Sequence, residues 1–118
     1  MRQPPAIDSF GAGGFRVSGD WRAGSLLLLD DTPLPWRPRR LSDVTVADFS
    51  AVLAAGPAVS EFVLLGTGAV QALPSREVRD AIRSAGLGLE FMATPSAART
   101  YSVFISEGRR VAVALIAI

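Results

Sequence analysis

Apolar residues form unbroken runs in three segments of the chain. A strand predicted over Trp21–Leu29 ends in four leucines, a strand over Phe62–Leu65 precedes Gly66, and Val111–Ile118 is apolar at nearly every position. Such runs lack the alternation of a half-exposed strand, which indicates burial on both faces of a sheet. We therefore expect Val111–Ile118 to be a central strand.

Shorter apolar segments surround the glycines near the N-terminus. Strands are predicted over Ile7–Phe10 and Phe15–Val17, joined by glycines that permit positive φ. Together with Trp21–Leu29 they predict an N-terminal β meander. The following segment, Asp30–Arg40, is expected to be a loop because its three prolines lack the N–H that a strand ladder needs.

Helical spacing of apolar residues appears in three later segments. Thr45 and Asp48 have the spacing of a capping box, Ser75 is placed to cap the second helix, and Thr94 is expected to cap the third, with Pro95 at its first position. Each helix is expected to end at a glycine: Gly56, Gly86 and Gly108.

The order of these elements predicts the fold class. From Phe62 onward, strands alternate with helices, with Leu87–Met92 as the middle strand. This order predicts an α/β fold with parallel strand neighbours. No repeat or linker divides the chain, so residues 1–118 are expected to form a single domain.

Composition narrows the chemistry. The 118 residues include neither Cys nor His, and all 12 basic residues are Arg. The usual general base, thiolate nucleophiles, Schiff-base lysines and the commonest metal ligands are therefore missing. We expect no catalytic residue, no metal site and no cofactor, and Tyr101 is expected to be a packed core residue.

Charge and hydropathy narrow the location and the partners. The net charge of +1 gives no general attraction to nucleic acid. A membrane span needs about 20 apolar residues, and no run here is that long. No signal-peptide pattern follows the first residues, so a cytoplasmic location is expected.

A candidate ligand site follows the strand over Phe62–Leu65. Free N–H groups at the carboxyl ends of parallel strands can hold an anion. The predicted site residues are Gly66, Thr67, Gly68, Thr94 and Arg99. Two structural interpretations compete: a tight turn that needs glycine, and a salt bridge from Arg99 to Glu90 or Asp80.

A second candidate is the basic cluster around an aromatic residue in the proline-rich segment. Trp and Arg are favoured at protein interfaces, so Trp36, Arg37, Arg39 and Arg40 are predicted to bind a protein partner. Nucleic-acid binding is the weaker interpretation of so few arginines. Alternatively, Trp36 covers the edge of the core.

Several motifs together resemble a known family. The motifs are Leu64–Gly68, Gly86–Thr94, Ala97–Tyr101 and Glu107–Ile116, with Ile7–Gly11, Ser25–Leu29 and Trp36 before them. In this order they resemble domain-of-unknown-function family 498, whose mitochondrial relatives include an assembly factor of respiratory complex I. The family commonly has Asn where this chain has Ser102.

The resemblance implies a three-layer domain around a mixed sheet and no established catalytic activity. It further implies a non-enzymatic module that binds a protein partner, such as a component in the assembly of a membrane complex, and that sits at the inner membrane through that partner. Self-association into a homo-oligomer is a further hypothesis. The alternative is a small-molecule or anion-binding protein, or an enzyme, that uses the Gly66–Gly68 loop.

Overall fold

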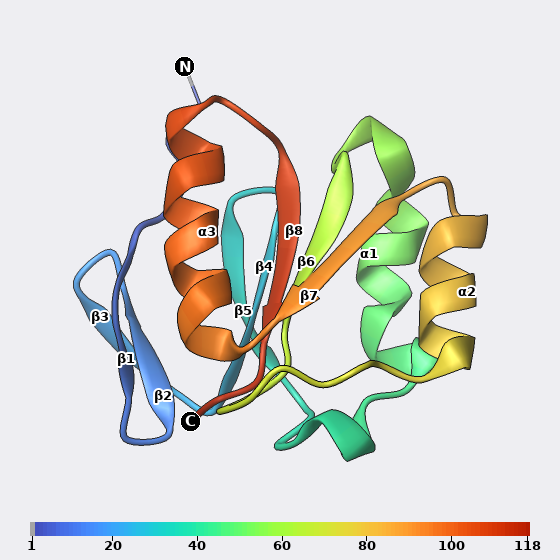
Figure 1. Cartoon of the computed structure of the whole chain (residues 1–118). Helices are drawn as coiled ribbons and strands as arrows, with labels where there is room; N and C mark the ends of the chain where they lie inside the picture. The colour runs from blue at the N-terminus through green and yellow to red at the C-terminus, as the bar shows by residue number, and fades with distance from the viewer. Residues whose placement is uncertain (1) are drawn as a thin grey trace.

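The predicted α/β architecture is confirmed, with a mixed sheet at its centre. The computed structural model describes residues 2–118, so Met1 lies outside the description. The strands of this central sheet are β4 (Ser25–Leu29), β5 (Thr32–Trp36), β6 (Phe62–Gly66), β7 (Gly88–Met92) and β8 (Val111–Leu115). Their spatial order is β5-β4-β8-β6-β7 (Figure 1). As expected, β8 is central, and it is buried from Ala112 to Leu115.

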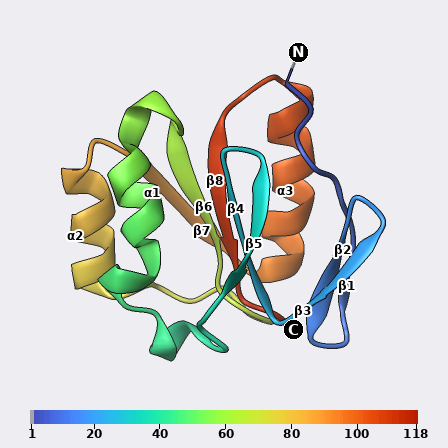
Figure 2. The same ribbon diagram turned by 180° about the vertical axis from the view of Figure 1, so that it is seen from behind.

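The chain connections place helices on both faces of this sheet. Helix α2 (Arg76–Ser84) links β6 outward to β7, and α3 (Thr94–Ser106) leads from β7 back across β6 to β8. β6 is parallel to both neighbours, and parallel connections are almost always right-handed. Because the two connections run in opposite directions along the sheet, their helices lie on opposite faces (Figures 1 and 2).

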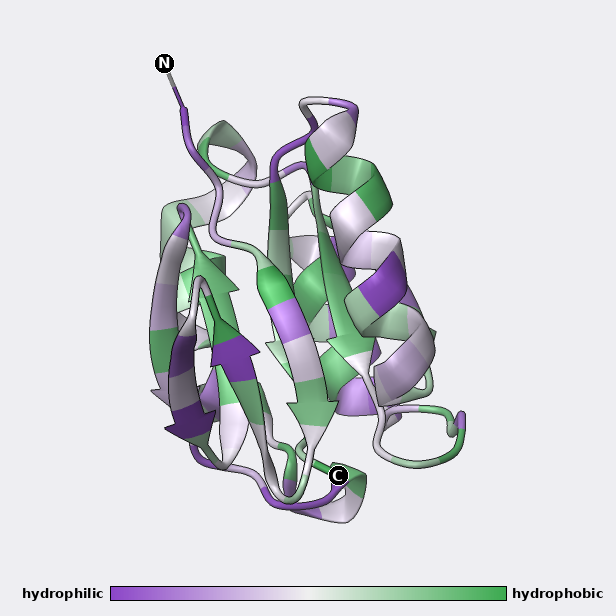
Figure 3. Ribbon diagram, turned by 90° about the vertical axis from the view of Figure 1, so that its left-hand side faces the viewer, coloured by the Kyte–Doolittle hydropathy of each residue, from purple (hydrophilic) through white to green (hydrophobic). Residues whose placement is uncertain are grey.

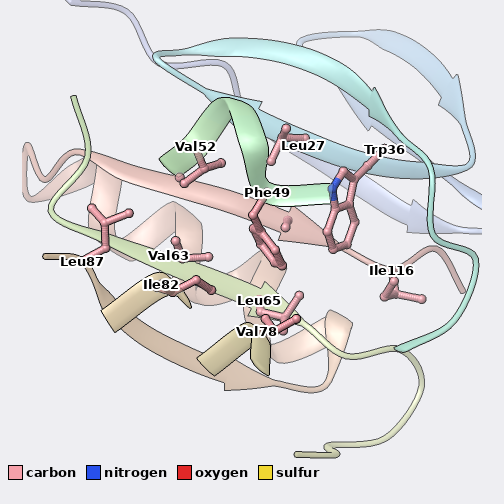
Figure 4. Close-up of a cluster of buried hydrophobic side chains, with 12 residues drawn as sticks. Leu27, Trp36, Phe49, Val52, Val63, Leu65, Val78, Ile82, Leu87 and Ile116 are labelled. Atoms are coloured by element: carbon pink, nitrogen blue, oxygen red, sulfur yellow. The ribbon is translucent and has the colours of Figure 1, made fainter. Parts of the chain in front are cut away.

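The first face is covered by α2 and α1 (Ser50–Ala55), together with the short 3₁₀ turns η1 (Leu41–Asp43), η2 (Val46–Phe49) and η3 (Gly56–Ala58). Trp36 and Phe49 meet edge to face here, with ring centroids 5.4 Å apart. They pack with Val52 of α1, Ile82 of α2 and the sheet side chains beneath (Figure 4).

The second face is shared by α3 and a small antiparallel sheet of β1 (Ile7–Gly11), β2 (Gly14–Val17) and β3 (Asp20–Ala23), which is the predicted meander. Phe15 and Val17 are buried in one cluster with Leu26 and Leu28 of β4. Polar residues recur along the outer strands of the small sheet, while the strands behind it are mostly apolar (Figure 3). The fold therefore has three layers.

The expected strand over Trp21–Leu29 is wrong in one respect, because it breaks at Gly24. That residue has φ +85°, a left-handed conformation that glycine adopts without strain. The break sends β3 into the small sheet and β4 into the central sheet.

The expected loop over Asp30–Arg40 also needs correction, since β5 pairs with β4 along the edge of the central sheet. Pro33 pairs with Leu28 and Pro35 with Leu26, so the prolines are two residues apart and face the same way. An edge strand needs N–H groups on one side only, and prolines are tolerated on the solvent side. The residues that alternate with the prolines form the backbone hydrogen bonds to β4.

Helix ends follow the predicted signals with two exceptions. The segment that begins after Thr45 is the 3₁₀ turn η2, and α1 begins only at Ser50. Thr45 and Asp48 form the capping box of η2, and the Ser75 hydroxyl accepts the N–H of Val78 at the start of α2. The N-cap of α3 is Ala93 and not Thr94. The Thr94 hydroxyl points elsewhere, because it bonds to residues that only the tertiary fold brings near.

Replacement of Gly24 tests the strand break. Gly24→Ala is expected to lower the free energy of unfolding by about 1–2 kcal/mol, because a Cβ strains a left-handed backbone. No atom lies within 4 Å of that Cβ position, so the cost is conformational. Gly24→Asn should cost less, since Asn tolerates this region. Equal losses in urea unfolding for both variants would contradict the assignment.

Candidate functional site

The carboxyl end of β6 forms a hydrogen-bonded junction with α3 and the end of β8. The Thr94 hydroxyl donates to the Ile116 carbonyl at 2.7 Å and accepts the Gly68 N–H at 3.0 Å. The Thr94 N–H donates to the Gly68 carbonyl at 2.8 Å, and Ile116 N–H donates to the Gly66 carbonyl at 3.0 Å. Thr94 is fully buried. Gly68 and Thr94, which were predicted to hold a ligand, are therefore bonded to each other, and the Gly66 carbonyl is bonded to Ile116.

Gly66 allows this junction to close. A Cβ at this position would lie 2.8 Å from Leu115 Cδ2 and 2.9 Å from Thr94 Oγ1. Real Cβ contacts are not that short, so a side chain would push α3 away from the strand ends. The requirement for glycine is therefore one of close packing.

Thr67 anchors the loop that follows the junction. Its N–H donates to the Met92 carbonyl at 2.8 Å, and its hydroxyl donates to the Val70 carbonyl at 2.7 Å. The same hydroxyl accepts the Ala72 N–H at 3.2 Å. The Thr67 side chain thus fixes the backbone of this loop.

The anchored loop carries apolar side chains into solvent. Val70 is 72% exposed and Leu73 is 61% exposed. We call residues 69–73 the apolar loop. Sequence analysis missed these two residues, although apolar residues between a strand end and a helix cap, outside any strand or helix pattern, were an available signal.

Arg99 lies away from the other predicted ligand residues, so the structure brings together four of the five. It lines a hollow of about 140 Å³ between β1 and α3, with Asp8, Phe10 and Ser102. Its expected salt bridge to Glu90 or Asp80 does not form, because Arg99 has no ion pair within residues 2–118. The Ile7–Gly11 and Ala97–Tyr101 motifs meet at this hollow.

The predicted partner cluster divides into a core residue and surface residues. Trp36 is 6% exposed, and its indole N–H donates to the Asp48 carbonyl at 2.9 Å. Trp36 therefore covers the core, as the structural interpretation held. Arg37, Arg39 and Arg40 are exposed.

An ion pair fixes the start of this basic segment. The Arg37 guanidinium donates to both carboxylate oxygens of Asp48, each at 2.8 Å. This hydrogen bonding, aided by the Thr45 N–H and hydroxyl, lowers the pKa of Asp48 to about 2. The capping box and the basic segment thus share one carboxylate.

Tyr101 is a packed core residue, as predicted. Its hydroxyl donates to the Pro5 carbonyl at 2.6 Å, and burial raises its pKa to about 12. It therefore ties the N-terminal segment to α3 and keeps its proton at neutral pH.

Two further features concern metal ligands and membrane-spanning helices. Residues 2–118 hold no group of three or more acidic side chains placed to bind a metal ion. No helix among them has the length and apolar character that crossing a membrane requires.

Comparisons with known proteins agree in one family. The model of a family described as "Protein of unknown function (DUF498/DUF598)" matches residues 7–116. An uncharacterized protein of Rhodobacter capsulatus is 36% identical over 110 residues, which cover 93% of this chain and 82% of that protein.

A named relative comes from the rat: NADH dehydrogenase (ubiquinone) 1 alpha subcomplex assembly factor 3. It is 33% identical over 93% of this chain, and the match spans 59% of the rat protein's length. Among solved structures, one described as an outer membrane protein from Bartonella henselae superposes with a TM-score of 0.88 at 30% identity. That superposition covers 97% of this chain and 95% of the Bartonella chain.

Gly66→Ala tests the packed junction. We expect a loss of about 2–3 kcal/mol in the free energy of unfolding, because overpacking forces backbone shifts. Thr94→Val should also destabilise, since it leaves the buried Gly68 N–H unpaired. Gly13→Ala is the comparison for backbone strain without crowding, because its Cβ position is open but its φ of +79° costs an alanine about 1–2 kcal/mol. Urea unfolding in which Gly66→Ala costs no more than Gly13→Ala would contradict this role.

Asp48→Asn tests the ion pair through pH. A depressed pKa in the folded state adds stability above the unfolded pKa near 3.8, and this stability is lost as pH falls toward 2. We expect Asp48→Asn to cost about 1–2 kcal/mol at pH 7, discounted because Arg37 lies in solvent, and far less at pH 2.5. Exposed Asp80→Asn is the control, and a deficit independent of pH would contradict the ion-pair assignment.

Proposed function

Because the chain belongs to the DUF498/DUF598 family, we propose that it is a single protein-binding module that assists the assembly of a membrane protein complex and does not act as an enzyme. It reaches the membrane through its partner.

The match to assembly factors carries this proposal. The rat and human proteins, both named assembly factor 3, share 33% and 32% identity with this chain over 93% of its length. The chain spans 59% of the length of either protein.

Two surfaces support partner binding. The apolar loop exposes Val70 and Leu73 on a base that is fixed by Thr67, so docking costs little ordering of the backbone. Arg39 and Arg40 extend from a segment that the Arg37–Asp48 pair holds in place. We propose that the partner contacts both surfaces, with Trp36 supporting the basic segment from the core.

The rival hypothesis of an anion site at Gly66–Gly68 has less support. An anion at that rim needs free N–H groups. The N–H groups of Thr67, Gly68 and Thr94 already donate within the protein, and Arg99 lies at another hollow.

Affinity purification after crosslinking in the native host tests the proposal. We expect a tagged chain to enrich subunits of NADH dehydrogenase over a tag-only control, and a deletion strain to lose assembled enzyme on native gels. Val70→Asp with Leu73→Asp, and separately Arg39→Glu with Arg40→Glu, should each reduce enrichment several-fold. Arg is enriched among the residues that dominate interface energies, and a carboxylate placed in an apolar contact without a partner is costly, which is why these losses are expected.

Arg76→Glu with Arg83→Glu on the outer face of α2 is the matched charge control, because both residues are exposed. It should retain the partners, and circular dichroism should show that every variant is folded. Unchanged enzyme levels in the deletion strain, with no complex subunit enriched, would overturn the proposed function.

A further inference from the structure

A groove runs between the small sheet and the edge of the central sheet, and it meets the basic segment only at Arg39. One hollow, of about 230 Å³, is lined by Arg22 and Ala23 of β3, by the start of β4, and by Leu34 and Pro35 of β5. A second hollow, of about 480 Å³, shares Ala23 and Ser25 with the first and extends to Arg39. The two hollows therefore adjoin at Ala23 and Ser25, and together we call them the groove.

Arg22 points into the groove with an unused donor. It pairs across the strands with Phe15, and residues directly opposite in a ladder share one face of the sheet. Phe15 is fully buried against the central sheet, so Arg22 also turns inward. Within residues 2–118, the buried Nε of Arg22 has no hydrogen-bond acceptor. The Nε atom itself is out of reach of solvent, but the guanidinium that carries it lines the groove, where an acceptor from a partner can bind its terminal amino groups.

The strand that carries Arg22 has a free edge beside the groove. The Gly24 N–H donates to the Gly13 carbonyl across the small sheet. Because backbone groups alternate along a strand, those of Ala23 turn the other way, toward the groove. β3 is the last strand of the small sheet, so nothing in that sheet pairs with this edge.

Charge and hydropathy along the groove select the occupant. Arg22 lies toward one end and Arg39 toward the other, and the described lining includes no Asp or Glu. Leu26, Leu34 and Pro35 form an apolar wall beside Arg22. A free strand edge, an apolar wall and two cations complement an extended peptide that alternates acidic and apolar side chains.

We propose that this groove binds an extended acidic segment of a partner protein, with a carboxylate on the Arg22 guanidinium and a second near Arg39. The segment pairs with the edge of β3 and packs apolar side chains on Leu34 and Pro35. This inference rests on the proposed function, since it names the chemistry of the partner. It also gives Arg39 a defined role among the surface arginines.

Fluorescence anisotropy with designed peptides tests the groove. The probe is a labelled peptide of alternating Val and Glu, and the matched peptide replaces each Glu with Gln. We expect the purified chain to bind the Glu peptide about tenfold more tightly, with affinity falling as salt rises. Arg22→Met should weaken binding by about tenfold, Arg39→Gln should weaken it several-fold, and Arg76→Gln should leave it unchanged.

A stability measurement separates a binding residue from a structural one. Arg22→Met keeps the aliphatic volume and removes the unpaired donor, so its melting temperature should equal or exceed that of the unmodified chain. In the unmodified chain, the Glu peptide should shift the amide NMR signals of Ala23, Ser25 and Leu34. This second measurement does not depend on any variant folding.

The groove assignment would be overturned by equal affinity for the two peptides or by undiminished binding to Arg22→Met. A lowered melting temperature for that variant, or NMR shifts confined to other regions, would also overturn it. If complex subunits are still enriched from the host while the peptides fail to bind, the groove is wrong and the proposed function stands. If no complex subunit is enriched and the peptides also fail to bind, the groove assignment and the proposed function are both wrong.

Discussion

Strands β4, β6 and β8 carry buried apolar side chains on both faces, so the central sheet has to be covered twice. Helices α1 and α2 cover one face. On the other face α3 lies over β6 and β8, and the small sheet covers β4 through Phe15 and Val17. Where the small sheet meets the edge of the central sheet, a gap remains between the two. The groove that Arg22 lines is this gap, so the groove is a consequence of covering the second face with a small sheet.

The Thr94 junction gives a physical criterion for glycine-rich loops at strand ends. Such a loop binds an anion when its N–H groups are free. Here Gly66 lets α3 approach closely, and the Thr94 hydroxyl then satisfies Gly68 and Ile116 together. The same residue types therefore give a packed junction. Their neighbours in space decide the outcome, while their spacing in the chain does not.

The surfaces proposed for partner binding share one design, in which a rigid base presents a few exposed side chains. Thr67 holds the apolar loop, the Arg37–Asp48 pair holds the basic segment, and the ladder between β2 and β3 holds Arg22. Rigid bases reduce the entropy lost when a partner docks. Polar atoms without an internal partner and exposed apolar area can then contribute to the binding energy, which fits a protein-binding module.

Local pattern in the sequence was enough to predict the central strand β8, the strand–helix order from Phe62, and the caps at Thr45 and Ser75, because each depends on neighbours within a few residues. Tertiary structure alone decided the rest. Thr94 bonds to Ile116, Trp36 is covered by Phe49, and Arg22 faces a wall built from β5. Gly24 ends a strand because the chain passes there from the small sheet to the central sheet. Pro33 and Pro35 lie in a strand because β5 is at the edge of the central sheet. Contacts between distant segments decide which donors stay unpaired, and no local pattern records them.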